Sequence, residues 1–444
     1  MRNLFFYLGV CCVFSFLIIA CQEEEYTPIP PKVSIENLTG NETMVVEDTI
    51  WLKAQVVSPL ETALQWLVNG ELVSDDSIFA FTTNQLGKYN IVATATNTDG
   101  EMSTSTDIEV YGKYKYGTFV LSEGSGSDGG GSLVFISPKG VVTDTVFRKE
   151  NNGARLGMYS QDMYIHNNKM YIVSQNGGNE GGYLTIVNAE TMKYEKSFQE
   201  ELKGKVSAPT HIVVLSEQEI YLRCNKGISR FNPSTLETTF IKGSNGVRKN
   251  TMAVVNGKIF ASKGKEVRII ESGKDSISST ISFDANVSGV VRSSDGNLWV
   301  STADGFISKV DVSNCSIIKR NDTGQKSALS ASYAASPSIT AKGDTLYMSG
   351  LTSKIYRHIF SSNTTELMVD VKDYVEDCNI IYNTVAVHPI TGEVYLNSIK
   401  GYGTDYTKNN ISVFNFSVGE AQLKDNYRDH TRFPAGTFFT YNFE

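Results

Sequence analysis

The sequence predicts an all-β protein in which a small β-sandwich precedes a seven-bladed β-propeller. Three observations point to this fold. Short apolar runs are separated by Asn, Ser, Thr and Gly, which is the composition of a chain with many strands and turns. Polar and apolar residues alternate over much of residues 32–111. A strand centred on an aromatic residue then recurs at regular spacing through residues 112–444.

The first twenty residues have the pattern of a signal peptide. Arg2 precedes an apolar run from Leu4 to Ala20, and Cys21 follows at once. The small residue before the cysteine resembles a bacterial lipobox, although Ile18 and Ile19 stand where Leu and a small residue are commoner. We therefore expect residues 1–20 to be removed and Cys21 to become lipidated. An uncleaved N-terminal anchor helix is the alternative.

Residues 21–31 predict a tether between the lipid and the first domain. The segment holds a run of acids and three prolines, which resist compact folding. Acids directly behind the lipidated cysteine resemble the surface-export signal of Bacteroidota lipoproteins. That resemblance implies a lipid anchor in the outer membrane with the protein facing the cell exterior. A solvated acidic linker is the alternative.

Charge and cysteine usage exclude several classes of function. A net charge of −8 argues against nucleic-acid binding, because phosphates need a basic face. Cys224, Cys315 and Cys378 lie far apart, with no CxxC and no His at metal-ligand spacing. We therefore expect free thiols, no metal site and no cofactor, and leave open one disulfide between two of the three.

Residues 32–111 predict the sandwich. Their apolar residues alternate in short segments, with Asn69-Gly70 and Asp99-Gly100 as hairpin turns. The segments 65–70 and 87–97 resemble PKD-like modules, which usually act as spacers. The absence of a cysteine pair argues against a disulfide-bonded immunoglobulin domain. We expect a PKD/Ig-like sandwich that serves as a spacer.

Residues 112–444 predict the seven propeller blades. Most units place a short strand and a tight turn before the aromatic strand, and a second apolar strand after it. Four strands in about 40 to 50 residues is the pattern of a propeller blade. Residues 437–441 form a spare β-rich segment that suits completion of the first blade and closure of the ring. The recurring aromatic residues are Phe119, Tyr171, Tyr221, Phe260, Trp299, Tyr347 and Tyr395.

The predicted connections make the two faces of the propeller unequal. The face that receives the connections between blades, and between the second and third strand of a blade, carries long loops; we call it the loop-rich face, and its opposite the short-turn face. Long loops on a rigid scaffold are where binding residues concentrate. We therefore predict a ligand site on the loop-rich face, with ordinary rim residues as the alternative for each member. The candidates are Arg155, Tyr159, Gln175, Asn176, Arg223, Arg248, Tyr333, Tyr382, Tyr402, Tyr406, Arg428, His430 and Arg432.

Catalytic motifs are missing from the sequence. The five histidines fall in separate units, and neither Gly-x-Ser-x-Gly nor His-Glu-x-x-His occurs. The glycine-rich residues 124–131 lack the Lys-Ser/Thr ending of a phosphate-binding loop. We predict a protein that is not an enzyme. Because a propeller can assemble a site from separate blades, a hydrolase or lyase with His211 and His430 as acid or base stays an alternative.

Several local motifs resemble the YncE-like propeller lipoproteins of Bacteroidota. They are residues 117–124, 156–157, 161–163, 171–176 and 434–439. Members of this broad group include lipoproteins that capture corrinoids for TonB-dependent outer-membrane transporters. The resemblance implies a surface protein that captures a small nutrient ligand, corrinoid-like or other, for such a transporter. The added PKD-like module departs from the simplest corrinoid-binding members. An adhesion or assembly protein that binds protein or glycan is the alternative.

Overall fold

The computed structural model describes residues 26–330, 338–417 and 421–440. Its elements are strands, apart from a short α-helix, α1 (Val146–Glu150), and two 3-10 helices at Val371–Asp373 and Gly403–Thr407, so the predicted all-β class is confirmed. The chain divides into two compact units, of which the first ends at Tyr111 and the second begins at Gly112. Cys21, Tyr333 and Tyr441 lie outside the described residues. Within the described ranges, no helix is long and apolar enough to cross a membrane.

The first unit is a sandwich of two sheets. Its core is formed by residues that alternate with exposed ones, and Leu52 and Trp66 are fully buried there. The Trp66 indole nitrogen donates a hydrogen bond of 2.8 Å to the backbone oxygen of Asp76, so burial leaves no unpaired indole N–H. One sheet has the order β1-β3-β6 and the other β2-β8-β7-β4-β5. Their strands are β1 (Lys32–Asn37), β2 (Thr43–Val45), β3 (Ile50–Val57), β4 (Ala63–Val68), β5 (Glu71–Ser74), β6 (Ile78–Phe81), β7 (Gly87–Asn97) and β8 (Gly100–Tyr111).

Both predicted hairpin turns of the sandwich are present. Asn69 and Gly70, which join β4 to β5, have φ values of 51° and 87°, as a type I′ turn requires. At the turn between β7 and β8, Asp99 accepts a hydrogen bond of 2.8 Å from the backbone nitrogen of Ile29 and another from the Tyr26 hydroxyl. The last residues of the predicted tether are therefore bound to the sandwich by a side chain of this turn.

The second unit contains seven four-stranded sheets within the described residues. We number them 1 to 7 by their innermost strands, which are β36, β12, β16, β20, β24, β28 and β32. Sheets 1 to 3 contain β36 (Pro434–Phe439), β9 (Thr118–Ser122), β10 (Ser132–Ile136) and β11 (Val142–Thr143); β12 (Met158–His166), β13 (Lys169–Gly177), β14 (Leu184–Asn188) and β15 (Tyr194–Phe198); and β16 (His211–Ser216), β17 (Glu219–Cys224), β18 (Gly227–Asn232) and β19 (Glu237–Phe240).

The remaining sheets follow the same order of strands. Sheets 4 and 5 contain β20 (Ala253–Val255), β21 (Lys258–Lys263), β22 (Glu266–Glu271) and β23 (Ser279–Ser282); and β24 (Val287–Arg292), β25 (Leu298–Thr302), β26 (Phe306–Asp311) and β27 (Ser316–Asp322). Sheets 6 and 7 contain β28 (Ile339–Lys342), β29 (Thr345–Met348), β30 (Lys354–Ile359) and β31 (Thr364–Asp370); and β32 (Ile380–Val387), β33 (Val394–Ile399), β34 (Asn409–Asn415) and β35 (Gln422–Arg428).

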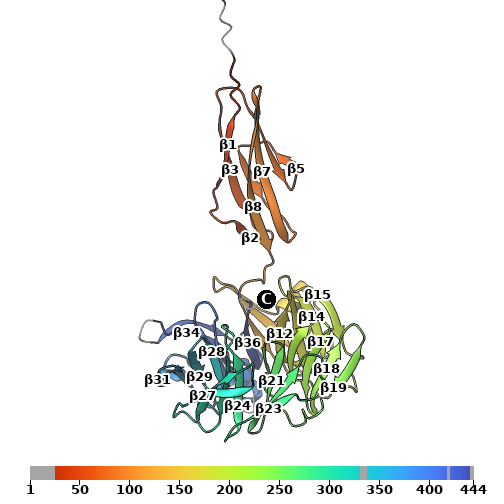
Figure 1. Cartoon of the computed structure of the whole chain (residues 1–444), viewed down its shortest axis with the longest axis vertical. Coiled ribbons are helices and arrows are strands. Elements are labelled where there is room, and N and C mark those ends of the chain that lie inside the picture. Colours follow the sequence, from red (N-terminus) through yellow and green to blue (C-terminus); the bar gives the residue numbers. More distant parts are fainter. Residues whose placement is uncertain (1–25, 331–337, 418–420, 441–444) are drawn as a thin grey trace, which may run out of the picture. The chain divides into compact units, whose positions relative to one another are not determined.

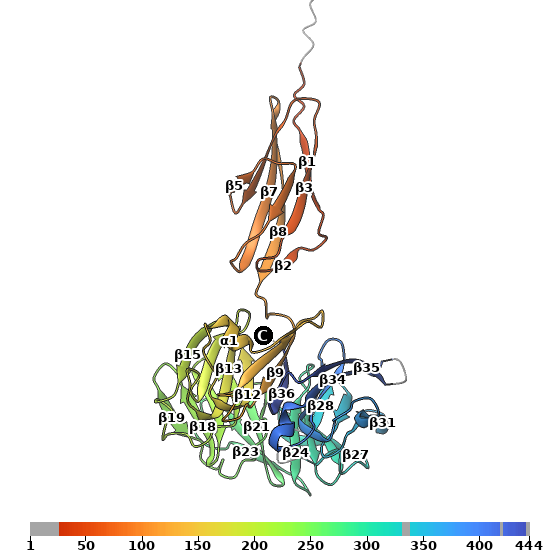
Figure 2. The ribbon, with the colours of Figure 1, turned by 180° about the vertical axis from the view of Figure 1, so that it is seen from behind.

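The innermost strands form a closed cycle, so the second unit has the architecture of a β-propeller. Each innermost strand contacts the next one in the order of the sheets, and β32 contacts β36, which in turn contacts β12. Figures 1 and 2 show the sheets of this unit following one another in chain order, from the yellow and green strands to the blue ones. The predicted closure by the end of the chain is confirmed, because β36 pairs with β9 antiparallel, with Phe438 opposite Phe119. The Thr440 hydroxyl and the backbone of Gly117 also exchange hydrogen bonds of 2.7 and 3.1 Å.

The recurring aromatic residues occupy the second strand of each sheet, as the sequence predicts. Phe119, Tyr221, Phe260 and Trp299 are fully buried, and the other three are at most 7% exposed. Each large buried side chain of this kind stabilises the fold by about 1.5–3 kcal/mol through the apolar area removed from water. The regular aromatic spacing in the sequence therefore marks the packing between neighbouring sheets.

The loops are shorter than the sequence indicated in several places. Gln175 and Asn176 belong to β13, Arg223 belongs to β17, and Arg428 ends β35, so the connection from β35 to β36 is only residues 429–433. The predicted inequality of the faces comes mainly from the connections between sheets. Residues 199–210 and 241–252 are examples, whereas residues 167–168 are all that joins β12 to β13 on the opposite face.

Candidate functional site

A cavity of about 590 Å³ lies at the centre of the propeller, between the innermost strands of all seven sheets. Its wall exposes polar and apolar surface in about equal parts, and Met163, Val290, Ile339 and Val385 are among the apolar lining residues. Such a volume is within the range of small-molecule sites, which are mostly apolar with a few placed polar groups. The polar groups therefore decide what the cavity can recognise.

Polar side chains line both ends of this cavity. Gln161 and Asp162 lie on the half of β12 that begins on the loop-rich face, and His211 begins β16 from the same side. At the short-turn end, the lining includes Arg292 and the exposed Ile390. The two ends of the cavity therefore differ in chemistry.

The innermost strands are irregular where they leave the loop-rich face. The pairing registers of β12, β24, β32 and β36 shift near their first residues. Tyr159, Asn383 and Phe433 adopt positive φ values of 58°, 50° and 59° at these places. Bulges of this kind re-aim side chains next to binding sites, and positive φ is uncommon for large residues such as Tyr and Phe. Three inner strands therefore begin with irregular backbone on the loop-rich face, although positive φ values also occur in turns of the short-turn face, as at Asn168 and Met192.

Glu123 is the centre of a partly buried polar cluster at the loop-rich end. Its carboxylate accepts hydrogen bonds from the Gln161 amide at 2.8 Å, the Tyr382 hydroxyl at 3.2 Å and the Asn383 amide at 3.2 Å. These partners come from sheets 2 and 7, whereas Glu123 directly follows β9 of sheet 1. Burial raises the pKa of Glu123, and the charge of Lys249 opposes that shift. We call Glu123, Gln161, Lys249, Tyr382 and Asn383 the polar cluster.

Asp162 is the most deeply buried carboxyl group of the cavity wall. Its two oxygens accept hydrogen bonds from the backbone nitrogens of Met163 at 2.9 Å and Ile212 at 3.1 Å. Burial raises its pKa to about 7, and these two hydrogen bonds only partly offset the cost of desolvation. Nearby, the His211 ring lies 3.1 Å from the Thr210 hydroxyl. Asp162 is therefore a group that can exchange a proton near neutral pH.

Arg223 holds the segment that carries Lys249. Its guanidinium donates to the Val247 backbone oxygen at 3.1 and 3.3 Å and to the Thr210 hydroxyl at 3.2 Å. The side chain of Lys249 follows two residues later and is partly buried, which lowers its pKa. Arg248 points to another strand, where it donates to the backbone oxygen of Val287 at 2.9 Å.

An aromatic cluster adjoins the polar cluster. The ring of Phe433 lies 4.5 Å from that of Tyr406 at an interplanar angle of 8°, 5.5 Å from that of Tyr382 and 6.4 Å from that of Tyr402. Tyr402 is 66% exposed, so one of these rings is open to solvent. We call Tyr382, Tyr402, Tyr406 and Phe433 the aromatic cluster. Flat rings of this kind offer rigid contact area at low entropic cost.

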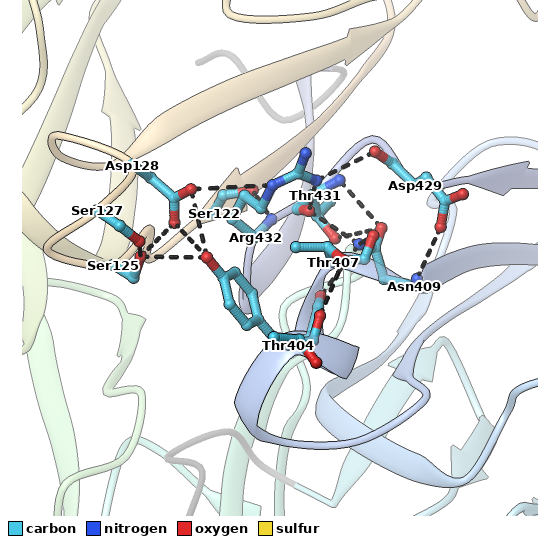
Figure 3. A network of polar contacts seen from close by, with 11 residues as sticks. Ser122, Ser125, Ser127, Asp128, Thr404, Thr407, Asn409, Asp429, Thr431 and Arg432 are labelled. Atoms are coloured by element: carbon cyan, nitrogen blue, oxygen red, sulfur yellow. Dashed lines mark hydrogen bonds and ion pairs between the residues drawn. The ribbon is translucent and has the colours of Figure 1, made fainter.

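A hydrogen-bond network fixes the loop that carries Phe433 (Figure 3). The Asn409 side chain donates to the Thr431 backbone oxygen at 2.8 Å and accepts from the Thr431 backbone nitrogen at 3.0 Å. On the other side, Asp128 accepts a hydrogen bond of 2.6 Å from Ser125 and lies 3.9 Å from the Arg432 guanidinium. The Tyr406 hydroxyl contacts the same Asp128 carboxylate at 3.3 Å. The aromatic cluster therefore rests on ordered polar contacts between sheets 1 and 7.

The structure brings together only part of the predicted site. Tyr382, Tyr402 and Tyr406 meet at Phe433, and Arg432 directly precedes Phe433 in the same loop. Arg223 and Arg248 are not among the residues that line the cavity, and both donate to backbone oxygens. The other described candidates are Arg155, Tyr159, Gln175, Asn176, Arg428 and His430.

These other candidates do not come together at one site. Exposed Arg155 is bound to Glu180 through its backbone nitrogen, at 2.8 Å. Arg428 lies 3.7 Å from Asp377, and the His430 ring lies 2.8 Å from Asp144. Tyr159, Gln175 and Asn176 remain around the start of β12 and the end of β13.

Sequence reasoning missed six residues of the two clusters and the cavity: Glu123, Gln161, Asp162, Lys249, Asn383 and Phe433. A signal was present for two of them. Asp162 is a carboxyl in the buried middle of an inner strand, and Glu123 directly follows a fully buried strand. Phe433 gave no comparable signal, because its importance depends on tyrosines from a loop that is distant in the sequence.

The described residues contain no metal-binding group and no disulfide. In residues 26–330, 338–417 and 421–440, no group of three or more His, Cys, Asp or Glu side chains could hold a metal ion. Cys224, Cys315 and Cys378 are all free, and burial raises the pKa of the Cys224 thiol to about 12 and also that of Cys378. The disulfide that the sequence left open is not formed.

Comparisons with known proteins identify the propeller but no ligand. The family model described as "Domain of unknown function (DUF5074)" matches residues 116–440. No curated protein matches the chain. Among solved structures, a quinonprotein alcohol dehydrogenase-like protein from Bacteroides thetaiotaomicron is similar over 93% of this chain and 99% of its own, with a TM-score of 0.59 and 18% identity. That likeness shows the fold alone.

Two further solved structures are similar over a smaller part of the chain. The computationally designed Ika8 protein aligns with 68% of this chain and 82% of its own at 11% identity and a TM-score of 0.42. YCF48 bound to D1 peptide aligns with 64% of this chain and 90% of its own at 12% identity and a TM-score of 0.43.

Proposed function

This chain belongs to the family described as a domain of unknown function, DUF5074, and we propose that its propeller is a binding module whose ligand docks on the loop-rich face. In this proposal the propeller has seven blades, and the ligand sits on the aromatic cluster and reaches the polar cluster at the end of the cavity. The module captures its ligand and does not transform it.

One observation carries the proposal: Tyr382 belongs to both clusters. Its ring contacts Phe433 at 5.5 Å, and its hydroxyl donates to Glu123 at 3.2 Å. A ligand that covers the rings is therefore brought to a set of buried hydrogen-bonding groups. Recognition sites commonly combine rigid aromatic area with a few placed polar groups in this way.

The cellular setting of the proposal comes from the N-terminal sequence. Cys21 carries the lipid, residues 22–31 are the tether, and the PKD-like sandwich spaces the propeller from an outer membrane whose exterior it faces. A small nutrient ligand, corrinoid-like or other, then passes to a TonB-dependent outer-membrane transporter. The adhesion alternative, in which the propeller binds protein or glycan, uses the same face.

A second candidate function, a hydrolase or lyase, has one observation in its favour. Asp162 and His211 both line the cavity, and burial raises the pKa of Asp162 to about 7, where a carboxyl group can act as a general acid or base. The other predicted catalytic residue, His430, pairs with Asp144 instead. Turnover that is abolished by Asp162→Asn would replace the binding proposal by this one.

A thermal-shift screen with corrinoids, siderophores, haem and glycans tests the binding proposal. A ligand present at about a hundred times its dissociation constant stabilises the protein by about 2.7 kcal/mol. We expect one class to raise the melting temperature of the wild type and to lose this effect in Tyr402→Ala/Tyr406→Ala. An equal shift in both proteins would contradict the proposed site.

A further inference from the structure

We infer that the short-turn end of the cavity binds an amphipathic acid, whose carboxylate pairs with Arg292 and whose alkyl chain enters the cavity. This site is separate from the one proposed on the loop-rich face, and neither depends on the other. The ligand class follows from the residues of the cavity wall, the charge at its short-turn end and the rim around that end.

The wall of the cavity offers apolar contact to a chain that enters it. Six of the seven innermost strands, all except β16, contribute apolar side chains to the wall. A volume of about 590 Å³ is enough for a small ligand. Each methylene group that moves from water into apolar surroundings tightens binding about four-fold. The wall residues of this kind include Ile165, Val291, Ala341, Val387 and Phe438.

Arg292 is the only lysine or arginine among the described residues of the cavity wall. It is exposed and ends β24, which turns back into β25 on the short-turn face. Its guanidinium forms no hydrogen bond and no ion pair with another described residue. The planar fork of an arginine matches a carboxylate with two parallel N–H donors. A ligand carboxylate at this end can therefore pair with Arg292 while its chain faces the apolar wall.

The loop-rich end of the cavity is less suited to a carboxylate. The ionisable lining groups there are the buried Asp162 and the buried His211. An ionised Asp162 would repel a ligand carboxylate placed beside it, because the interaction between like charges is strong where water is excluded. The difference between the two ends therefore orients the ligand, with its acid at Arg292 and its chain toward Asp162.

Ile390 gives the short-turn end an apolar rim that is held in place. Its side chain is 62% exposed although it lines the cavity. The Lys342 ammonium donates to the Ile390 backbone oxygen at 2.6 Å, and the Ile390 backbone nitrogen donates to the His388 ring at 3.2 Å. Lys342 forms no ion pair with a carboxylate of the described residues. A second positive charge therefore stands beside an exposed apolar side chain, and an amphipathic anion would cover both.

The carboxylates of the adjoining turns have other partners. Asp295, in the turn after β24, accepts hydrogen bonds from the Ser293 hydroxyl and from the Asn297 amide, the latter at 2.6 Å. Glu393 pairs with the Lys424 ammonium at 2.5 Å. Neither carboxylate lines the cavity. The charge that a ligand meets at this end of the wall is therefore positive.

The experiment uses the full chain and three probes with the same alkyl chain: octanoate, 1-octanol and octylammonium. We expect titration calorimetry to show that octanoate binds ten-fold or more tightly than either of the others. From hexanoate to octanoate, the affinity should rise about four-fold per methylene group. Arg292→Met should reduce the affinity for octanoate to that for 1-octanol, and Arg292→Lys should keep octanoate as the preferred probe.

The matched control is Arg148→Met, which changes an exposed arginine that does not line the cavity. It should bind all three probes as the wild type does. Melting curves of Arg292→Met should match the wild type, because the substitution breaks no hydrogen bond or ion pair among the described residues.

Three results overturn the inference: equal affinities for the three probes, unchanged octanoate binding in Arg292→Met, or no binding of any probe at millimolar concentration. The variant Tyr402→Ala/Tyr406→Ala separates this site from the loop-rich face, because it should bind octanoate as the wild type does. Octanoate binding that is lost in this variant and kept in Arg292→Met would overturn the inference and leave the proposed function standing.

Discussion

The ring of Tyr406 lies parallel to that of Phe433, with 4.5 Å between their centres and 8° between their planes. Phe433 adopts a φ of 59°, which few large residues tolerate, and Tyr406 reaches Asp128 on the far side with its hydroxyl. The stack therefore joins the connection before β36 to loops of sheets 7 and 1. The face on which we place the ligand is held in one geometry by contacts that are distant in sequence.

Asn409→Ala should loosen this stack. The buried Asn409 side chain exchanges hydrogen bonds with both backbone groups of Thr431, and its loss leaves buried polar groups unpaired at a cost of about 1–3 kcal/mol. Urea unfolding of the variant should show this loss of stability. Asn415→Ala, which removes a local hydrogen bond to the Ser417 backbone nitrogen, is the control and should change stability less. Equal effects would argue against a special role for Asn409.

Deletion of residues 434–444 should open the propeller. The deletion removes β36, so that β9 loses its ladder partner and presents an unpaired edge. We expect aggregation or a much lower melting temperature in light scattering and calorimetry. Deletion of residues 441–444 alone keeps β36 and is the control. A soluble protein with unchanged melting after the longer deletion would rule out closure through β36.

Asp162→Asn should change how stability depends on pH. Burial raises the pKa of Asp162 from 3.8 to about 7, so the folded state keeps a proton that the unfolded state has lost. This contribution to stability is fully present below about pH 4 and is lost as the pH rises through 7, at up to about 1.4 kcal/mol per pH unit. Relative to the variant, the wild type should therefore become less stable between pH 5 and pH 8.

Urea titrations of both proteins at several pH values measure this difference and cancel the contributions of other groups. Asp75→Asn, which changes an exposed carboxyl of the sandwich, is the control. A stability difference between wild type and Asp162→Asn that stays constant from pH 5 to pH 8 would show that Asp162 is not withdrawn from solvent.

Cys21→Ala should prevent lipidation. The mutant protein should leave the membrane fraction or keep its first twenty residues, because in the predicted lipobox the cysteine thiol is the group that accepts the lipid. Membrane fractionation and mass spectrometry of the N-terminus provide the measurement. An unchanged fraction and an unchanged N-terminus would contradict the lipoprotein prediction.

The sequence predicted the scaffold well because its signals are local and repeated. A buried aromatic residue occurs in the second strand of each of the seven sheets, so Tyr171 and Trp299 mark their sheets without knowledge of the fold. The closing strand was also recognisable, because Phe438 and Phe439 stand in a β-rich segment beyond the last repeat. The tight turn at Asn69 and Gly70 follows from backbone sterics alone.

The site was harder to predict because it depends on contacts between sheets. Tyr402 and Tyr406 were chosen for their residue type and loop, and the structure brings them to Phe433, which the sequence did not single out. Arg428 was chosen on the same grounds, but its guanidinium pairs with Asp377. The role of Glu123 could not be predicted, because its hydrogen-bond partners come from sheets 2 and 7, far away in the sequence.

Calorimetric affinity of a Tyr402→Ala/Tyr406→Ala variant for the ligand found by screening tests the central claim most directly. Each truncated aromatic anchor should cost about 1–2 kcal/mol or more of binding free energy, while melting curves change little for the exposed Tyr402. The control is Tyr194→Ala/Tyr374→Ala, two exposed tyrosines outside the aromatic cluster, which should bind as the wild type does. If the control variant lost affinity and the Tyr402/Tyr406 variant kept it, the ligand site would not lie on the loop-rich aromatic cluster.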